Sequence, residues 1–412
     1  MNPNKASRLP RLLITLLLIV PILAARNICT VEANLNGTDD TPAILAAFQS
    51  CGNGGNIVFL NHTYFVNSVM NTTGLNDCQI DLYGTLLWST NITYWLNNSL
   101  PVGYQNQSSA WFLGGDNIVF RGHGYGTFDG NGQTWYDFVS GVSNYPGRPH
   151  ALTISNTKDS LFDGLRFVQS QMWTMTITHS ERTTLSNIYV NSTSSSHSPA
   201  RNTDGADTMF SDSITFDRWT VVNGDDSISL KANSTNIVIK NSTFYRGLGV
   251  AIGSIGQYKG VFETIENVTV TDIVSYNTLY AAYIKTWTGQ QVNYPPNGGG
   301  GGLGLVARNL TFTNFTMYNT TGTGVFYITQ CTTFSSVAGD CNTSLFNIRD
   351  IKVTNITGYV GTSYVASMQC SADSPCTGIE IEDVDVHHLT TDGTLDDLYI
   401  CKNVEDTIGF SC

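Results

Sequence analysis

A small polar residue followed by alternating β-forming residues recurs along most of this chain. Clear copies occupy residues 117–120, 184–188, 213–216 and 236–239, and the pattern continues as far as 378–381. The closest copies are 23 or 24 residues apart, and the longest intervals, 41 to 43 residues, fit two coils. Short strands that recur at such a period are typical of a parallel β-solenoid, in which every coil pairs with its neighbours.

The predicted fold is therefore an all-β parallel β-helix with a short N-terminal capping helix. A β-sandwich would need strands at intervals of about 8–12 residues joined by hairpin turns, and the sequence shows no regular hairpin pairing. Residues 39–50 carry a helix-start signal, because Asp40 and Pro42 precede an apolar run. Since a solenoid must cover its open ends, we expect this helix to lie over the first coil.

The first 25 residues have the features of a signal peptide. Basic residues precede an apolar run over 12–23 that is shorter than a membrane-spanning helix needs, a membrane anchor being the alternative. Fifteen Asn-x-Ser/Thr sequons also indicate export. We therefore expect a secreted, extracellular glycoprotein in which residues 1–25 are removed and residues 26–412 form a single β-helix catalytic domain.

The nine cysteines suit an oxidising compartment, where they would form disulfides. Spacing alone does not fix connectivity, but four pairs are plausible. They are Cys29/Cys51, Cys331/Cys341, Cys370/Cys376 and Cys401/Cys412. Cys78 is left over and is predicted to be buried and free.

Composition excludes several classes of protein. Charged residues make up 13% and hydrophobic residues 41%, which argues against disorder and against a coiled coil. The net charge of −12 disfavours binding to nucleic acid or to an acidic membrane, since both need a basic surface. We expect a monomer with neither of these partners.

Three aspartates are spaced so that they would stack on neighbouring coils. Asp204 precedes Asp225 by 21 residues, about one coil, and Asp226 follows directly. For Asp225 and Asp226 both to face outward the backbone must bend, which Gly224 permits. Clustered carboxylates repel one another and raise at least one pKa, which gives the acid and base that glycosidic hydrolysis needs. Ordinary turn aspartates or a calcium site are the alternatives.

The order of motifs resembles glycoside hydrolase family 28, the polygalacturonase family. The motifs are Asn-Thr-Asp at 202–204, Gly-Asp-Asp at 224–226, Gly-x-Gly at 247–249, Ser-Ile-Gly-Gln-Tyr at 254–258 and x-Ile-Lys at 283–285. The resemblance implies a right-handed helix and inverting hydrolysis of a pectic polysaccharide or oligosaccharide, without a metal or cofactor. It also implies that Asp225 is the general acid and that Asp204 and Asp226 activate water.

The chain departs from the family pattern where the family binds substrate carboxylates. Leu248 stands in place of a histidine, and Tyr283 in place of an arginine, whereas Lys285 is retained. The family's cysteine after the paired aspartates is Ser227, and its usual partner position is Phe244. Losing the arginine removes a carboxylate clamp and offers an aromatic face instead.

These departures favour a neutral 6-deoxy sugar at the cleaved end. We predict that Leu248, Tyr283, Lys285, Gln257 and Trp287 bind substrate, with Lys285 free to hold a galacturonate on the leaving side. The pattern resembles the exo-acting fungal branch of the family. The favoured function is an inverting exo-glycosidase that removes terminal α-L-rhamnose from rhamnogalacturonan-type chains. The alternatives are an exo-polygalacturonase that releases galacturonate, a calcium-dependent pectate lyase, and an inactive pectin-binding protein.

Two further features have open interpretations. His197 could replace the missing histidine or could be a residue of a surface loop. The glycine-rich tract 297–304 could be a lid beside a groove or a tolerated insertion.

Overall fold

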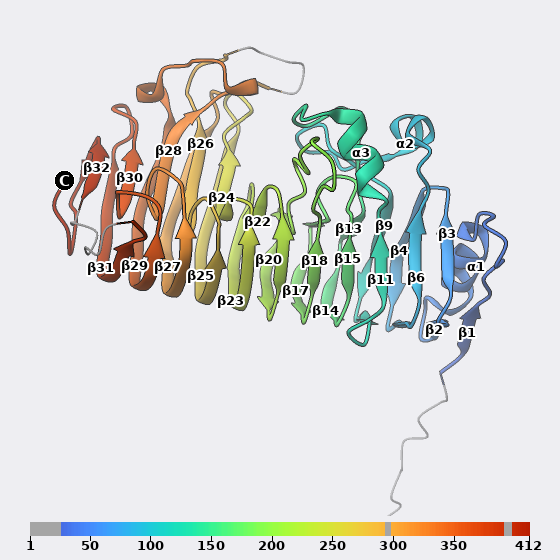
Figure 1. Cartoon of the computed structure of the whole chain (residues 1–412). Helices are drawn as coiled ribbons and strands as arrows, with labels where there is room; N and C mark the ends of the chain where they lie inside the picture. Colours follow the sequence, from blue (N-terminus) through green and yellow to red (C-terminus); the bar gives the residue numbers. More distant parts are fainter. Residues whose placement is uncertain (1–25, 293–297, 391–397) are drawn as a thin grey trace, which may run out of the picture.

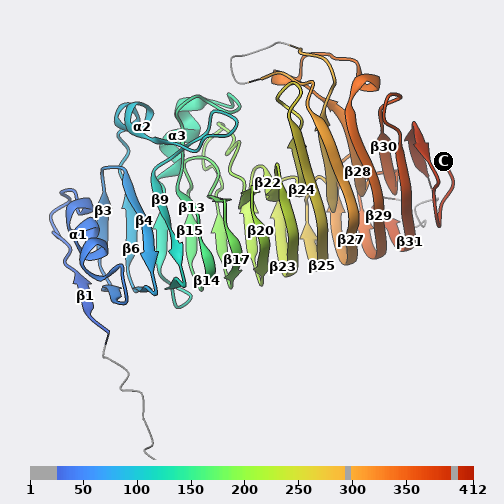
Figure 2. The same cartoon turned by 180° about the vertical axis from the view of Figure 1, so that it is seen from behind.

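The chain winds into a right-handed parallel β-helix, which confirms the predicted fold class (Figures 1 and 2). The computed structural model describes residues 26–292, 298–390 and 398–412. The predicted signal peptide, residues 1–25, lies outside the described residues. Each coil contributes a strand to three parallel sheets, and five long strands each belong to both the first and the second sheet.

The strands of the three sheets follow one another along the helix axis. The first sheet contains β1 (Ile28–Val31), β2 (Asn56–Phe59), β5 (Gln79–Leu82), β10 (Val119–Arg121), β14 (Lys158–Asp163), β17 (Glu181–Ser186), β20 (Asp212–Asp217), the five long strands and β33 (Val404–Glu405). The long strands are β23 (Ser234–Arg246), β25 (Phe262–Tyr276), β27 (Leu303–Thr320), β29 (Leu345–Val360) and β31 (Cys376–His388). The second sheet adds β3 (Thr63–Val66), β6 (Thr85–Trp88), β11 (Thr127–Asp129), β15 (Arg166–Val168), β18 (Tyr189–Asn191) and β21 (Thr220–Asn223). The third sheet contains β4 (Met70–Asn76), β9 (Trp111–Asp116), β13 (Leu152–Ser155), β16 (Met175–Thr178), β19 (Asp207–Met209), β22 (Asp226–Leu230), β24 (Gly249–Ile255), β26 (Ala282–Trp287), β28 (Phe326–Thr332), β30 (Ala366–Gln369) and β32 (Tyr399–Lys402).

Helices and short elements decorate this frame. They are α1 (Thr41–Cys51), α2 (Ile92–Asn98), α3 (Gly132–Val139), two 3₁₀ turns (Phe334–Ser336 and Cys341–Thr343) and a small separate sheet of β7 (Leu100–Pro101), β8 (Ser108–Ser109) and β12 (Pro149–His150). In the described ranges, none of the helices has the length and apolar character needed to cross a bilayer.

The polar residue of the repeat makes the bends between strands. Asn117, Asn187 and Asn236 all have left-handed backbone, with φ of 55°. Asparagine tolerates this conformation better than other non-glycine residues, which explains its place in the pattern. Each of the three donates its side-chain N–H to an aspartate of the preceding coil, at 2.6 to 2.9 Å. The repeat therefore encodes both the bend and a hydrogen-bonded ladder between coils.

The predicted capping helix is confirmed as α1. Its Ile44 and Phe48 are buried, and the Phe48 ring meets Trp111 edge-on at 5.7 Å, so the helix closes the core at the first coil. Asp40 precedes the helix but does not cap it with its side chain. Its two carboxylate oxygens instead accept from the backbone N–H of Asn34 and of Phe65, each at 2.7 Å.

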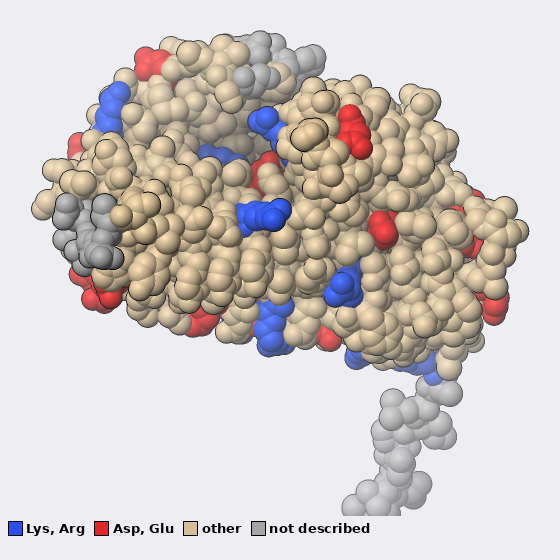
Figure 3. Space-filling view, viewed as in Figure 1, with Lys and Arg blue, Asp and Glu red and all other residues tan. Residues whose placement is uncertain are grey.

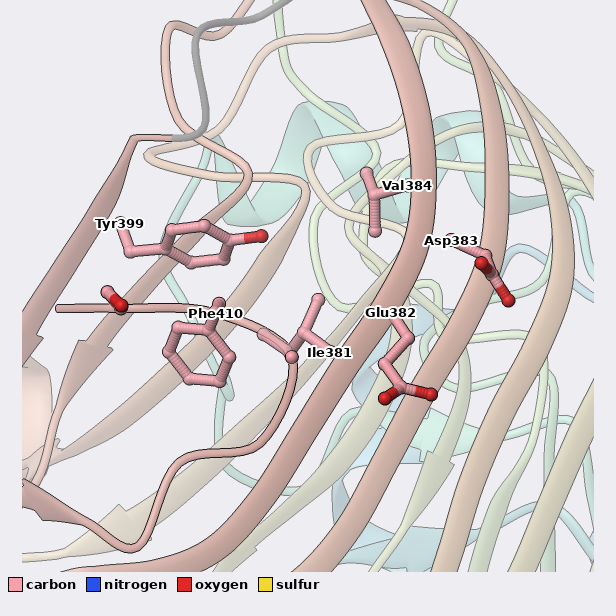
Figure 4. Close-up of a pocket in the computed structure, with 8 residues that line it drawn as sticks. Ile381, Glu382, Asp383, Val384, Tyr399 and Phe410 are labelled. Atoms are coloured by element: carbon pink, nitrogen blue, oxygen red, sulfur yellow. The ribbon is translucent and has the colours of Figure 1, made fainter.

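The last residues of the chain fold over the opposite end of the helix. Tyr399 and Phe410 stack with ring centroids 4.6 Å apart. With Ile381 they line a hollow of about 520 Å³ that also carries Glu382 and Asp383 (Figure 4). This hollow belongs to the C-terminal end of the helix.

The four plausible cysteine pairs all form disulfides. They are Cys29–Cys51, Cys331–Cys341, Cys370–Cys376 and Cys401–Cys412. Cys78 is buried and free, as expected, and burial raises its pKa to about 11. Phe244 lies in the core at the position where the family has a cysteine.

We predict that Asp40→Asn destabilises the protein by about 1–3 kcal/mol, because an amide nitrogen would face a backbone N–H donor in a buried site. The measurement is the free energy of unfolding from denaturant titration. Asp116→Asn, at an exposed carboxylate, is the matched control. An Asp40→Asn midpoint equal to that of the control would contradict the prediction.

Candidate active site

Two raised lobes flank the middle of the third sheet. One consists of α2, α3 and their loops, which precede third-sheet strands, and the other of the described parts of the loops that follow β24, β26 and β28 (Figure 1). Between them the surface is hollowed, and both acidic and basic side chains are visible in the hollow (Figure 3). We call this hollow the groove.

Coil stacking brings the three predicted aspartates together. The backbone N–H of Gly205 donates to the carbonyl of Asp226 at 3.0 Å, which sets the segment before β19 beside the start of β22. An oxygen from each of Asp204, Asp225 and Asp226 lies within 4.8 Å of the other two. This is closer than the roughly 6.5–9.5 Å that usually separates the two carboxyl groups of inverting glycosidases.

The expected bend at the paired aspartates is present, but Gly224 is needed there for a reason other than backbone flexibility. Asp225 precedes β22, and the pairing of β22 with β24 is irregular between Asp226 and Ile228. A Cβ on Gly224 would lie 2.3 Å from the carbonyl oxygen of Ala200. Gly224 is therefore needed because two backbones approach closely here.

Asp226 is held by two neighbours from β26. Lys285 Nζ lies 3.0 Å from one of its carboxylate oxygens, and the Tyr283 hydroxyl donates to the other. Lys285 also donates to the Tyr283 hydroxyl at 2.7 Å, which closes a three-residue network. Desolvation, together with the negative charge of Asp226, raises the pKa of Tyr283 well above its usual range, so Tyr283 is a neutral donor.

Asp204 and Asp225 have weaker compensation. Asp225 accepts from the backbone N–H of Asn202 and from its neighbour Asp226, both at 3.0 Å. Asp204 is 2% exposed, and its Oδ1 has no hydrogen-bond partner among the described residues. Desolvation is the largest cause that raises the pKa of both groups, followed by repulsion from the neighbouring aspartates.

A second charged pair lies under the same sheet and was missed at the sequence level. Asp207 and Lys231 are both buried, and their Oδ1 and Nζ atoms are 3.1 Å apart. Burial raises the pKa of Asp207, and the positive charge of Lys231 opposes that shift. Lys231 also donates to Ser229 at 3.0 Å and lies 4.8 Å from the centre of the Trp173 ring. Both residues look like ordinary strand positions in the sequence, so no signal distinguished them.

Two more buried residues near the site were also not predicted. The Arg148 guanidinium bonds through Nε to the carbonyl of Gln171, and both of its Nη atoms lack a hydrogen-bond partner within the described ranges. Burial lowers its pKa to about 10, a shift that the charges of Asp204 and Asp225 oppose. His150 stacks on Trp173 at 4.6 Å, and burial lowers its pKa to about 3, so it is neutral. His197, in contrast, is an exposed loop residue.

An apolar wall adjoins the carboxylates. Tyr283 packs with Ala251 and Tyr280, and the half-buried Leu248 packs against this cluster. Tyr280 stacks on Tyr327 of the next coil with centroids 5.0 Å apart. Leu248 and Tyr283 therefore help to form one surface, as their places in the sequence suggested.

Gln257 and Trp287 lie at the other end of the same strands. Asp226 pairs with Gly249 at the start of β24, whereas Gln257 follows the end of β24 and Trp287 ends β26. Both side chains are buried. The described part of the glycine tract packs here too, because Gly302 approaches Gly256 so closely that a Cβ would lie 2.5 Å from its Cα.

The two lobes meet at one edge of the groove. The Tyr104 hydroxyl donates to Glu263 at 3.1 Å, and the backbone N–H of Gln105 donates to the Tyr258 hydroxyl at 2.9 Å. Tyr104 also packs edge-on against Phe210, the residue after β19, at 5.7 Å. This contact joins loops about 150 residues apart, next to the C-terminal ends of β19 and β24.

The three carboxylates suit a divalent cation poorly. Their oxygens are close enough to share an ion. However, Asp226 already contacts the Lys285 ammonium and the Tyr283 hydroxyl, and a positive charge at 3.0 Å opposes a second cation. The geometry instead fits a water molecule that hydrogen-bonds to two carboxylates at once.

Comparisons with known proteins agree with this geometry. The sequence profile described as "Glycosyl hydrolases family 28" matches residues 66–412. Alpha-L-rhamnosidase rgxB of Aspergillus niger is 56% identical over 389 residues, which covers 94% of this chain and 90% of the relative. Exopolygalacturonase of Cochliobolus carbonum is 34% identical, and the match covers 98% of this chain and 87% of that relative. The crystal structure of endo-xylogalacturonan hydrolase from Aspergillus tubingensis matches with a TM-score of 0.80 at 30% identity, over 93% of this chain and 98% of that one.

We predict that Asp204→Asn stabilises the folded protein at neutral pH. The folded-state pKa of Asp204 is raised, so the wild type loses stability as pH rises above the unfolded value near 4 and through the folded value. The asparagine variant lacks this loss. Its free energy of unfolding should exceed that of wild type by about 1 kcal/mol or more at pH 7, since one pKa unit is worth about 1.4 kcal/mol, and by little at pH 3. Asp373→Asn, an exposed control, should show no such difference at either pH.

Proposed function

Because the chain belongs to glycosyl hydrolase family 28, and is thus a hydrolase of O-glycosyl bonds, we propose that it removes terminal α-L-rhamnose from rhamnogalacturonan-type pectic chains. We propose further that it is a secreted monomer. Four disulfides suit a secreted protein. The similarity to the alpha-L-rhamnosidase supports the choice of sugar.

One structural observation carries this choice. Both lysines beside the three aspartates are already paired with buried carboxylates, Lys285 with Asp226 and Lys231 with Asp207. The remaining wall is apolar and aromatic. A neutral sugar with a methyl group at C5 suits such a surface, whereas a uronate would bring a further negative charge beside lysines that are already paired.

The proposed roles are those that the family resemblance implies, and the surroundings of Asp225 and Asp226 support them. Asp225, whose pKa is raised by burial, protonates the leaving oxygen. Asp226, held by Lys285 and Tyr283, and the neighbouring Asp204 hold and deprotonate the attacking water. The inverting course is inferred from the family. Leu248 and Tyr283 would contact the terminal sugar, with Gln257 and Trp287 farther along the same strands.

Exo action is supported by the contact between the lobes. Because Tyr104 and Gln105 reach Tyr258 and Glu263, we infer that the groove is closed at one edge. A polymer could not continue past that edge, so a chain end would be the part that enters.

A second candidate is an exo-polygalacturonase. Lys285 remains about one-fifth exposed, and a substrate carboxylate could compete with Asp226 for it. The similarity to the exopolygalacturonase also favours this alternative. An inactive pectin-binding protein is disfavoured, because the three carboxylates are clustered as acid–base chemistry needs.

The decisive experiment identifies products from rhamnogalacturonan oligomers and from oligogalacturonides, each with a blocked reducing end. We expect single rhamnose units from the first substrate, released as the β-anomer if the reaction inverts, as NMR during the first turnovers would show. Asp225→Asn should lower the rate about a hundredfold or more. Release of galacturonate alone would identify the second candidate, and no release from either substrate would favour the binding protein.

We also expect activity to survive removal of divalent cations. The Lys285 ammonium opposes a second cation at Asp226, so EDTA followed by gel filtration should leave the hydrolysis rate unchanged. Activity that is lost and then restored by calcium, with unsaturated products absorbing in the ultraviolet, would instead identify a lyase.

A further inference from the structure

A ladder of tyrosines runs along the outer face of the second sheet. Tyr245, Tyr276 and Tyr318 pair in register on β23, β25 and β27. Their rings stack with centroids 4.9 and 4.7 Å apart and planes within 8° of parallel. Stacking covers both faces of Tyr276, but Tyr245 is the first ring of the ladder and has one face uncovered.

The ladder is interrupted at β21, the neighbouring strand. Val222 pairs with Tyr245 in register, so a small side chain stands where the next ring would be. On the far side of β21, Asn191 of β18 is in register with Val222, and Tyr189 is two residues earlier on the same face. Asn191 donates to the Tyr189 hydroxyl at 3.1 Å, and the Arg166 guanidinium lies over the Tyr189 ring at 4.3 Å. β18 and β23 are two strand spacings apart, roughly 9.6 Å, which leaves room above Val222 for one flat ring that stacks on the open face of Tyr245.

The interruption is a cavity of about 610 Å³, which we call the tyrosine slot. It is lined by Tyr189, Asn191, Thr193, Thr220, Val222, Tyr245, Arg246 and Asn277. Val222 and the Tyr245 ring give it an apolar and aromatic surface, and its other lining residues add amides, hydroxyls and a guanidinium. This mixture is characteristic of sites that bind sugar rings, whose C–H faces pack on aromatic rings while their hydroxyls bond to the rim.

Arg246 gives the tyrosine slot its charge. The residue is exposed, and no carboxylate lies within ion-pair distance of it in the part of the chain that the structure describes. The protein as a whole carries a net charge of −12, so it repels acidic polymers unless a local cation attracts them. An arginine at the edge of an aromatic slot suits the carboxylate of a uronate.

We propose that the tyrosine slot is a second carbohydrate-binding site, outside the catalytic groove, that holds a galacturonate unit of an acidic pectic chain. The ring stacks on Tyr245 in the place of the missing ladder member, and its carboxylate pairs with Arg246. The site lies on the second sheet, next to the bend that leads to the catalytic residues, since Arg246 pairs with Asn223, two residues before Asp225. The choice of a pectic ligand rests on the proposed function.

The test is electrophoresis of the Asp225→Asn protein in gels that contain polygalacturonate, which the variant cannot degrade. Tyr245→Ala and Arg246→Gln on this background should each weaken retardation at least about fivefold, a hydrogen-bonded charge pair being worth roughly tenfold or more. Tyr318→Ala, at the far end of the same ladder, and Lys240→Gln, a cation elsewhere on β23, are the matched controls and should match the parent. Unchanged thermal unfolding would show that each variant folds.

Retardation that persists in both slot variants would overturn the inference. So would retardation that appears only after enzymatic removal of N-glycans, because Asn191 is a sequon and its own glycan would then occupy the slot. The rates of Tyr245→Ala and Arg246→Gln on short rhamnogalacturonan oligomers, in the active background, should equal the wild-type rate. A different result is that the enzyme with Asp225 intact releases no rhamnose while retardation still depends on Tyr245 and Arg246. That result would contradict the proposed function and leave the second binding site standing.

Discussion

Parallel pairing between successive coils is the constraint on which the site depends. Asp204 and Asp226 are 22 residues apart in sequence, yet one strand spacing, roughly 4.8 Å, separates their segments. Register then decides which side chains share a face, because a slip by one residue would turn every side chain to the opposite side. The buried core and the asparagine ladders hold that register on both sides of the site. The stacked coils thus impose a proximity that the carboxylates themselves oppose.

The energy cost of that proximity is offset by a small set of buried or partly buried cations. Lys231 pairs with Asp207, and Lys285 pairs with Asp226, each within 3.1 Å. Arg148 interacts electrostatically with Asp204 and Asp225, although it forms no ion pair with them within the described ranges. Asp204 still has a raised pKa and an oxygen without a hydrogen-bond partner among the described residues. A single proton shared among such groups is what acid–base hydrolysis requires.

The sequence predicts what local signals encode and misses what long-range contacts create. The repeat, the start of a helix near Pro42 and the neighbouring cysteines are local patterns, and the structures that they predict are confirmed. The motifs also indicated the three aspartates and Tyr283. Lys231 and His150, by contrast, occupy unremarkable β-forming stretches, and the bridge from Tyr104 to Glu263 joins loops that no spacing relates.

The solenoid repeat itself produces sequences that match the N-glycosylation sequon. Asparagine at a bend followed by a β-forming stretch with threonine is the solenoid repeat itself. Six sequon asparagines donate their side-chain amide to the preceding coil: Asn241, Asn267, Asn309, Asn314, Asn319 and Asn355. Their number therefore follows partly from the fold, and glycosylation stays a prediction.

The exchange of arginine for Tyr283 sets the charge balance of the active site. Four carboxylates, those of Asp204, Asp207, Asp225 and Asp226, face three cations, Lys231, Lys285 and Arg148. When these carboxylates together hold one proton, the charges of the seven groups cancel before any substrate binds. An arginine at position 283 would add a positive charge that an anionic sugar could neutralise. A tyrosine hydroxyl holds Asp226 in place without adding charge. A neutral sugar therefore binds without introducing an unpaired charge into the site, whereas an anionic sugar would introduce one.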